Sequence, residues 1–445
     1  MPKMRNDAYQ HQPYWWDVGH EAKPLRLDQL AASAGDIPAQ VDCVIVGAGY
    51  TGLSAALTLA RAGKSVAVLD AAQIGHGCSG RNGGLIGPSF HKLGLAGLRA
   101  KLGEAKATAI IRESMEILTW LKRFIGEEDI DCGLVQAGRF RGAVVDKHYD
   151  ELARQAETLN KVVDLSFEMV SKASQHHHIG SDFYRGGIVY PQDGHLHPGL
   201  YVKGLAELAL QAGAGIFTPC AVQKIEADSN GFKVSNADLS IQCGEVLIAT
   251  NGYTDASFPY LRRRVIPIRS ALISTEALPT QTMQELSPQR QGFGDTSRLV
   301  PYYRPSPDGT RMIFGGRAFD SADKPAVYSQ DLHRLMTRIF PQLQGSKISH
   351  AWSGTVAYTF DHAPHIGQIM QGKMAGVRYA MGYCGSGVGR ATWFGRKAAL
   401  KILNDPDGST PLDELNFDSR PLYSGNPWFM PAILRWHSLM DRFGY

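Results

Sequence analysis

A glycine-rich turn near the start of the chain has the residue types that hold a dinucleotide. The turn GAGYTG, residues 47–52, follows the apolar run 42–46 and precedes the Ala- and Leu-rich stretch 53–62. Its glycines permit a tight turn, close approach of the backbone to a pyrophosphate, and close packing of a helix on a strand. A second apolar run, 65–69, ends at Asp70, whose carboxylate can accept hydrogen bonds from ribose hydroxyls. The order of strand, turn, helix, strand and acid predicts a dinucleotide site without a 2′-phosphate.

Three later segments have the composition to contact the same ligand. Residues 75–84, GHGCSGRNGG, hold too many glycines for a helix, so they either lie against a ligand or form a flexible surface loop. Residues 246–252 read as a strand that ends in a small polar turn. Residues 382–390 form another glycine turn before a helix-like stretch, where backbone amides could hydrogen-bond a flavin carbonyl. Because NAD alone does not explain these extra turns, we predict FAD.

These motifs resemble those of the amine-oxidising flavoproteins of the D-amino-acid oxidase superfamily, and within it the γ-glutamylputrescine oxidase-like branch. Besides GCSGRNGG, the resemblance is carried by PYWWD at 13–17, PYYR at 301–304, GGR at 315–317 and DHAPHIG at 361–367. It implies hydride transfer from the carbon beside an amine nitrogen to flavin N5, which leaves an imine that water hydrolyses. The implied substrate is a small amine, such as a γ-glutamylated polyamine, an N-alkyl amino acid or a cyclic imino acid.

The residues that we predict to contact FAD belong to the glycine turns and their neighbours. They are Gly47, Gly49, Tyr50, Thr51, Gly52, Asp70, Ala71, Gly77, Cys78, Ser79, Arg81, Asn82, Gly83, Gly84, Val222, Ala249, Thr250, Asn251, Gly252, Gly354, Gly385, Ser386, Gly387 and Val388. Some relatives attach the flavin through a cysteine seven residues before the Asp of DHAPHIG. That position is Gly354 here, so we predict non-covalent FAD.

The resemblance also implies an α/β fold, in which a split Rossmann-like FAD-binding domain carries an inserted substrate domain with a mixed sheet. The helical spacing of apolar residues in 104–125 is compatible with this layout, as are the strand-like runs 140–145, 265–275 and 312–314. The predicted division is an FAD-binding domain of 38–95, 185–260 and 350–405, a substrate domain of 96–184 and 261–349, and a C-terminal helix in 425–445.

Three side chains are candidate catalytic residues. Tyr302, in PYYR, could pack on an alkyl amine or be a core tyrosine. Arg317, after two glycines, could hold a carboxylate as a bidentate pair or lie at the surface. His91 follows the GCSGRNGG turn, and the alternative is a loop histidine with satisfied hydrogen bonds. Sarcosine-oxidising relatives use a lysine to assist oxygen at a position that aligns with Ile313, so the electron acceptor is left open between oxygen and another acceptor.

Composition narrows the class of protein. The 445 residues are enough for two or three domains. A net charge of +4 without blocks of like charge gives no nucleic-acid footprint. The six cysteines lack a CxxC pair and fit reduced thiols, and no signal-peptide-like run opens the chain, so we predict a cytoplasmic protein. The His tract 176–178 lacks supporting acids, and we predict no metal site.

The C-terminal segment is amphipathic. Its apolar face would hold Ile433, Trp436, Met440 and Phe443. This pattern predicts a helix that docks on the chain itself. The alternative is a helix on a membrane surface, which would suit a dehydrogenase that reduces a quinone. A further alternative is a flavin-binding subunit whose electron transfer serves a partner subunit.

Overall fold

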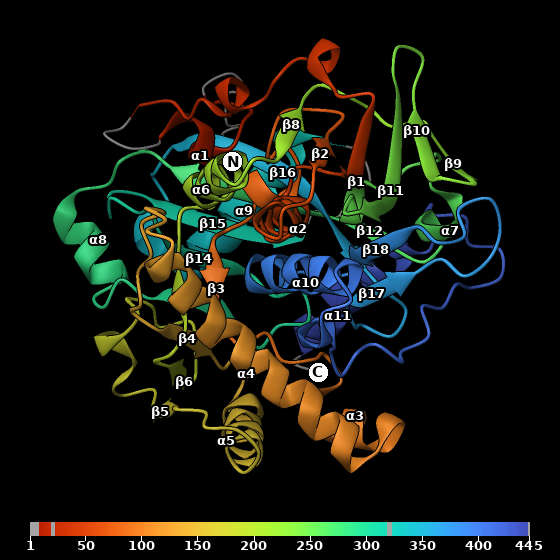
Figure 1. Cartoon of the computed structure of the whole chain (residues 1–445). Helices are drawn as coiled ribbons and strands as arrows, with labels where there is room; N and C mark the ends of the chain where they lie inside the picture. The colour runs from red at the N-terminus through yellow and green to blue at the C-terminus, as the bar shows by residue number, and fades with distance from the viewer. Residues whose placement is uncertain (1–8, 19–22, 318–322, 444–445) are drawn as a thin grey trace.

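Two eight-stranded sheets form the centre of the molecule (Figure 1). The structure is a computed structural model and describes residues 9–18, 23–317 and 323–443. Helices lie around both sheets, and the glycine turns lie where the sheets approach each other. The predicted layout of a Rossmann-like unit with a mixed sheet is therefore present.

The first sheet is the dinucleotide-binding one. Its strands are buried apolar runs, as expected for parallel strands with helices on both faces; Val44 and Ile45, for example, are fully buried. The central strands β1, β2, β8, β11 and β18 run parallel, whereas β17 is antiparallel to β18. The strand bounds are β1 Gln40–Val46, β2 Val66–Leu69, β8 Gly215–Phe217, β11 Ser240–Ile248, β18 Arg378–Met381 and β17 His365–Gln368, with the hairpin β9 Lys224–Asp228 and β10 Gly231–Ser235.

Two helices that begin at glycine turns lie side by side in the middle of the molecule (Figure 1). They are α2 Tyr50–Arg61 and α10 Gly387–Ile402. Their backbones meet closely, because a Cβ added to Gly395 would lie 2.2 Å from the Thr51 carbonyl oxygen. Helix α6, Pro198–Gln211, packs on the other side of α2. The close pairing fixes the first turns of α2 and α10 relative to each other.

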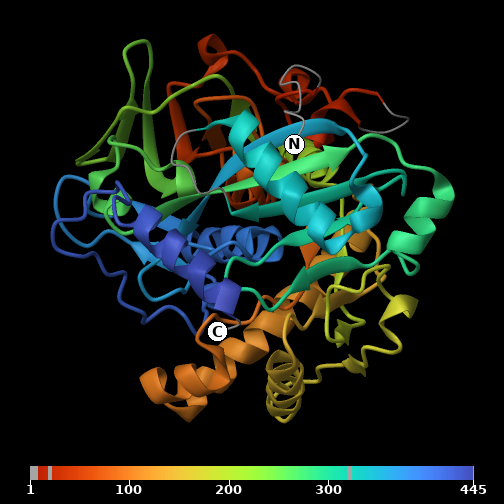
Figure 2. The ribbon, with the colours of Figure 1, turned by 180° about the vertical axis from the view of Figure 1, so that it is seen from behind.

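The second sheet is mixed: β13 and β4 are parallel, and the other neighbours are antiparallel. Its strands in spatial order are β16 Ile348–Tyr358, β12 Ile266–Thr275, β15 Met312–Arg317, β14 Tyr302–Pro305, β13 Gly292–Asp295, β4 Arg139–Gly142, β6 Gly187–Tyr190 and β5 Glu168–Val170. One face is covered by α9, Pro325–Ile339 (Figure 2), and by residues of α8, Thr280–Leu286. The other face turns toward the GCSGRNGG turn.

The helix predicted within 104–125 and the strand-like runs of the second sheet are confirmed as α4, Glu104–Glu127, and as β4, β12 and β15. Helix α4 packs on α10 through Trp120 and Trp393, whose ring centroids are 5.4 Å apart. The remaining elements are α1 Tyr14–Asp17, β3 Leu85–Ile86, α3 Gly94–Leu102, α5 Asp146–Asn160, β7 Gly194–His195 and α7 Pro259–Arg262.

Two strands of the second sheet come from ranges predicted for the FAD-binding domain. Strand β6 lies within 185–260 and β16 lies in 350–405 from its third residue on, and both pair within the second sheet. Strand β16 is paired with β12 from Ile348 to Tyr358, so its backbone hydrogen bonds fix it there. Periodicity identifies a strand but not its partner, so the sequence alone gave no indication of this pairing. The domain division itself stays a prediction.

The C-terminal helix α11, Met430–Phe443, docks on the rest of the chain through a different face from the predicted one. Leu434 is buried, and the Asp441 carboxylate accepts hydrogen bonds from the backbone N–H groups of Arg298 and Leu299 at 2.7 and 3.2 Å. Trp436 remains 59% exposed. The hydrogen bonds of Asp441 help to fix the orientation of α11, and a pattern of apolar residues does not predict them. Within the described residues, no helix is long and apolar enough to cross a membrane.

Candidate active site

The turn before α2 is held by two very close backbone contacts. Gly47 has a φ of +113°, and a Cβ there would lie 3.0 Å from the Ala249 carbonyl oxygen. A Cβ on Gly52 would lie 1.9 Å from the Gly47 carbonyl oxygen. Only glycine fits both places. The turn therefore has the shape that the GxGxxG spacing predicts.

The N-cap residues of α2 and α10 do not cap their own helices. Gly49, at the start of α2, has no side chain, and Ser386, at the start of α10, accepts no hydrogen bond from its helix. At α2 the Tyr50 N–H is taken by Ser79 Oγ at 3.0 Å. The first N–H groups of a helix need acceptors and carry its positive end. A bound pyrophosphate at α2 and a flavin carbonyl at α10 would supply them. The residues present thus fit FAD.

Asp70 lies against the same turn. Its carboxylate accepts hydrogen bonds from the backbone N–H of Ala48 at 2.7 Å and of Ala72 at 2.9 Å. Burial raises the pKa of the Asp70 carboxyl, and these two hydrogen bonds lower it in part. The carboxylate is therefore placed beside the start of α2, where the sequence predicts the ribose.

The GCSGRNGG turn wraps over the start of α2. The Tyr50 N–H donates to Ser79 Oγ at 3.0 Å. The Asn82 side chain closes the turn, donating to the Cys78 carbonyl at 2.9 Å and accepting from the Gly84 N–H at 2.7 Å. The turn is thus not a flexible surface loop: its hydrogen bonds fix it between α2 and the second sheet.

Two tryptophans that the sequence did not single out hold this turn from the other side. The indole N–H of Trp352, on β16, donates to the Arg81 carbonyl at 2.8 Å, and that of Trp15, on α1, donates to the Asn82 carbonyl at 2.8 Å. Both indoles are fully buried. Trp15 lies in the PYWWD motif, which was the available signal, whereas nothing in the sequence marks Trp352.

The turn after β11 and the turn before α10 lie against the turn before α2, and we call these three turns together the cradle. Asn251, with a φ of +46°, accepts a hydrogen bond from the Gly382 N–H at 2.9 Å and so ties the turn after β11 to the turn before α10. The Thr51 and Tyr383 hydroxyls are 2.7 Å apart, which links α2 to that last turn. Three segments far apart in the sequence therefore meet around Gly47.

The other predicted FAD contacts are distributed around this cradle. Val222 is buried in the core on one face of the first sheet, and Ala71 is exposed. A Cβ on Gly354 would lie 3.0 Å from Cys78 Sγ, so the position that carries a covalent flavin in some relatives faces the GCSGRNGG turn. Which of these residues contact FAD stays a prediction.

Tyr302 lies at the junction of the turn and the second sheet. A Cβ on Gly83 would lie 3.1 Å from the Tyr302 ring. The Tyr302 and Ser270 hydroxyls are 2.9 Å apart, and Ser270 Oγ donates to the Gly316 carbonyl at 3.0 Å. Because Ser270 has one hydroxyl proton, Tyr302 donates in this pair. Tyr302 is half-buried and packs against the cluster of Leu272, Ile313 and Trp352, and its role in a site stays a prediction.

The sheet face beside Tyr302 is apolar. Leu272, Ile313 and Trp352 are buried there in one cluster with the aromatic residues of α1. Ile313, at the position of the oxygen-assisting lysine of some relatives, therefore lies among hydrocarbon side chains. The buried Arg304 shares this face, because it pairs in register with Ile313 on the neighbouring strand.

The other two catalytic candidates are placed differently. His91 is buried beside α10, its Nδ1 accepts the Leu93 N–H at 3.1 Å, and burial with the Arg390 charge lowers its pKa to about 4. The backbone of Arg317 pairs with Ser270, and its side chain lies outside the described residues. His91 and Tyr302 therefore lie in different surroundings, and the structure does not indicate a role that they share.

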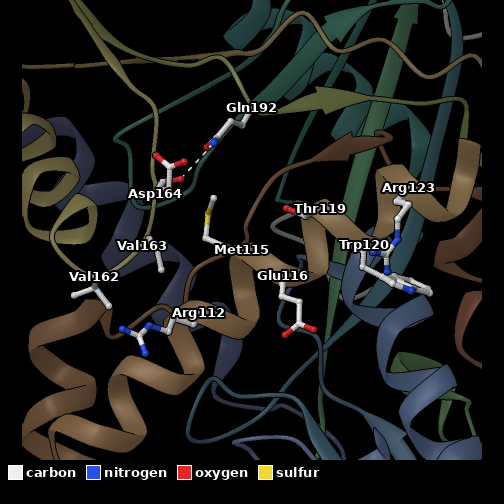
Figure 3. Close-up of a pocket in the computed structure, with 10 residues that line it drawn as sticks. All are labelled: Arg112, Met115, Glu116, Thr119, Trp120, Arg123, Val162, Val163, Asp164 and Gln192. Atoms are coloured by element: carbon white, nitrogen blue, oxygen red, sulfur yellow. Dashed lines mark hydrogen bonds between the residues drawn. The ribbon is translucent and has the colours of Figure 1, made fainter.

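A surface hollow of about 480 Å³ lies elsewhere, on the outer side of α4 (Figure 3). It is lined by α4 residues such as Arg112, Glu116 and Trp120 and by the loop that holds Asp164. Gln192 donates to the Asp164 carbonyl at 3.3 Å across it. None of the residues predicted for the site lines this hollow.

Known proteins share these features over most of the chain. The family model described as FAD dependent oxidoreductase matches residues 42–400. The probable oxidoreductase OrdL of Rhizobium meliloti is 32% identical over 414 residues, which are 91% of this chain and 93% of that protein. The γ-glutamylputrescine oxidoreductase of Escherichia coli is 29% identical over 411 residues, with the same coverage of both chains.

The fold has known counterparts as well. The crystal structure of glycine oxidase from Geobacillus kaustophilus has a TM-score of 0.68 at 19% identity and covers 87% of this chain and 99% of its own. This likeness confirms the predicted fold class, and the family match confirms FAD as the cofactor. The chain belongs to the family of FAD dependent oxidoreductases.

Proposed function

We propose that this enzyme oxidises a small amine at the carbon beside its nitrogen. The observation that carries the proposal is the placement of Tyr302 and an apolar sheet wall directly against the GCSGRNGG turn. Bound FAD would accept the hydride at N5, and the resulting imine would be released to water for hydrolysis. The chain's own residues bind the amine, orient it and exclude water.

The apolar wall acts on the charge of the substrate. Leu272, Ile313 and Trp352 are buried, so they would act through the low dielectric that they provide beside the turn, which disfavours an ammonium group and favours the neutral amine with its available lone pair. The Tyr302 ring, held by its hydroxyl on Ser270, offers a rigid side wall for an alkyl chain. Desolvation by these residues, and not a conventional acid–base pair, prepares the amine.

The relatives suggest which amine to test first. A relative that is 29% identical is named for γ-glutamylputrescine, so γ-glutamylated polyamines lead the panel. N-alkyl amino acids and cyclic imino acids follow. Tyr302 and Arg317 remain the proposed substrate contacts, with His91 as a third candidate.

The electron acceptor is a second part of the proposal. Ile313 places a buried hydrocarbon where sarcosine-oxidising relatives have the lysine that assists oxygen. This favours, as the alternative function, a dehydrogenase that passes electrons to a quinone or another acceptor, alone or through a partner subunit. A cytoplasmic location is proposed with it; sedimentation with liposomes would test the contribution of α11.

The test is an anaerobic absorbance spectrum of the purified holoenzyme while amines are added one at a time. Bleaching of the flavin by one amine identifies the substrate class, and admitting air then measures peroxide yield. Stoichiometric peroxide supports an oxidase, and a flavin that stays reduced in air supports the dehydrogenase. A flavin that no amine in the panel bleaches would contradict the amine proposal.

A further inference from the structure

Arg304, on β14, is a buried cation without an acidic partner. Its side chain is 1% exposed and lies on the same face of the strand as Tyr302. Nη2 donates to the Leu196 carbonyl at 2.9 Å, Nη1 donates to Nδ1 of His195, and the guanidinium carbon lies 4.9 Å from the ring centroid of Trp15. Across residues 9–18, 23–317 and 323–443, no carboxylate comes within ion-pair distance of Arg304.

His195 does not balance this charge. Its Nε2 lies 3.0 Å from the Arg290 carbonyl oxygen, so Nε2 carries the proton and donates there. Nδ1 is then the unprotonated nitrogen that accepts from Arg304. Burial and the neighbouring Arg304 charge lower the pKa of His195 to about 3, which keeps the ring neutral.

The pair therefore carries one full positive charge. Burial lowers the pKa of Arg304 to about 9, which leaves it protonated at neutral pH. By contrast, the fully buried Asp193 has an opposite charge beside it, since it lies 2.9 Å from Arg139. An unbalanced buried charge is costly, and its field is weakly screened.

The charge lies directly behind the proposed flavin contact. A Cβ on Gly84, the last residue of the GCSGRNGG turn, would lie 3.2 Å from Arg304 Nη2. The adjacent Gly83 faces the Tyr302 ring. The guanidinium therefore lies on the other side of the turn from a flavin that would contact Gly83 and Gly84.

We propose that Arg304 is a positioning residue for the redox reaction, whose unbalanced charge stabilises negative charge on the bound flavin and so raises its reduction potential. The cost of burying the cation is offset when the flavin is reduced, because fixed charges act most strongly on charge that develops in a dry site. The inference rests on FAD binding and not on the identity of the amine, so the two proposals fail separately.

The test compares the flavin potential in three holoenzyme variants by photoreduction against a reference dye, without substrate. Arg304→Met removes the charge, Arg304→Lys keeps it but loses the two-pronged hydrogen bonding, and His195→Gln keeps the cation and an acceptor for it. We expect Arg304→Met to lower the equilibrium constant for flavin reduction at least tenfold, or about 30 mV for two electrons. Arg304→Lys and His195→Gln should stay within threefold of wild type.

A structural role alone would give a different pattern. The proposal is overturned if Arg304→Met leaves the flavin reduction potential unchanged. It is also overturned if Arg304→Lys lowers the potential as far as Arg304→Met does. If Arg304→Met does not fold or retain FAD, a measurement on the wild-type holoenzyme decides. The N3 proton of the bound oxidised flavin, titrated by absorbance, should have a lower pKa than in free FAD, and an equal or higher pKa overturns the proposal.

Discussion

The two sides of the candidate site are built by different means. On the side of the first sheet, backbone does the work: Gly47 and Gly52 permit contacts that any Cβ would block, and two helix N-termini present N–H groups. The side of the second sheet is formed by side chains, namely Tyr302 and the apolar cluster of Leu272, Ile313 and Trp352. The first side tolerates only substitutions that preserve the backbone shape, whereas side chains on the second side can be replaced without altering the backbone.

This difference matches the proposed division into a cofactor side and a substrate side. A cradle formed largely by backbone suits a ligand that never varies, because most of its amides and its close packing do not depend on side-chain choice. A wall of side chains on a rigid sheet can be altered one residue at a time. Substitutions on the two sides should therefore have different effects on FAD content and on turnover.

The largest effect is expected from Gly52→Ala. The added Cβ would lie 1.9 Å from the Gly47 carbonyl oxygen, so the turn must open. We expect loss of FAD and a drop of more than about 3 kcal/mol in the free energy of unfolding. Flavin absorbance after gel filtration and urea unfolding measure the two quantities.

Gly126→Ala is the matched control, since it makes the same change in α4, where a Cβ meets nothing within 4 Å. It should be neutral or stabilise by about 0.5 kcal/mol, because alanine is the better helix former. A Gly52→Ala protein that keeps its flavin and its stability would show that the cradle is looser than described.

A substitution of His91 tests whether its imidazole is buried beside α10 or lies nearer the proposed substrate site. Its pKa is lowered to about 4 from 6.5, so the folded state favours the neutral ring. The stability that this contributes is present above pH 6.5 and is lost as the pH falls toward 4. The loss amounts to about 3 kcal/mol in the free energy of unfolding, and His91→Gln should lack it.

Urea unfolding at pH 7 and pH 4 measures that loss. His176→Gln, in an exposed stretch, is the matched change of residue type and should show the same fall as wild type. If the free energy of unfolding of His91→Gln falls as far as that of wild type between pH 7 and pH 4, His91 is not buried beside α10. A role nearer the substrate would then gain support.

The smallest effect is expected from two neighbouring tyrosines on opposite faces of β14. Tyr302→Phe removes the hydroxyl that is bonded to Ser270, and we expect kcat/KM to fall about tenfold with full FAD content, equal to about 1.4 kcal/mol. Tyr303→Phe removes a hydroxyl that lies 2.7 Å from that of Tyr184, on the face under α9. It should cost about 1 kcal/mol of stability and leave kcat/KM unchanged.

Equal kinetic effects in the two variants would remove Tyr302 from the substrate site. Loss of FAD in Tyr302→Phe would instead break the division between the two sides, because it would make a side chain of the second sheet part of the cradle.

Local chemistry in the sequence determined the nucleotide side. The spacing of Gly47, Gly49 and Gly52 after an apolar strand sets backbone shape directly, so the βαβ unit and the family were predictable, and so was FAD. The same local reading placed α4 and the strands β4, β12 and β15. Each of these rests on neighbours in the chain.

Only the tertiary structure decided the contacts between distant segments. It assigned β6 and β16 to the second sheet, turned α11 by its Asp441 anchor, and placed Trp352 on the Arg81 carbonyl. It also left Arg304 buried beside Gly84 with no acidic partner among the residues that the structure describes. Such features depend on which side chains meet across the fold, and sequence spacing carries no record of distances between segments separated by a hundred residues or more.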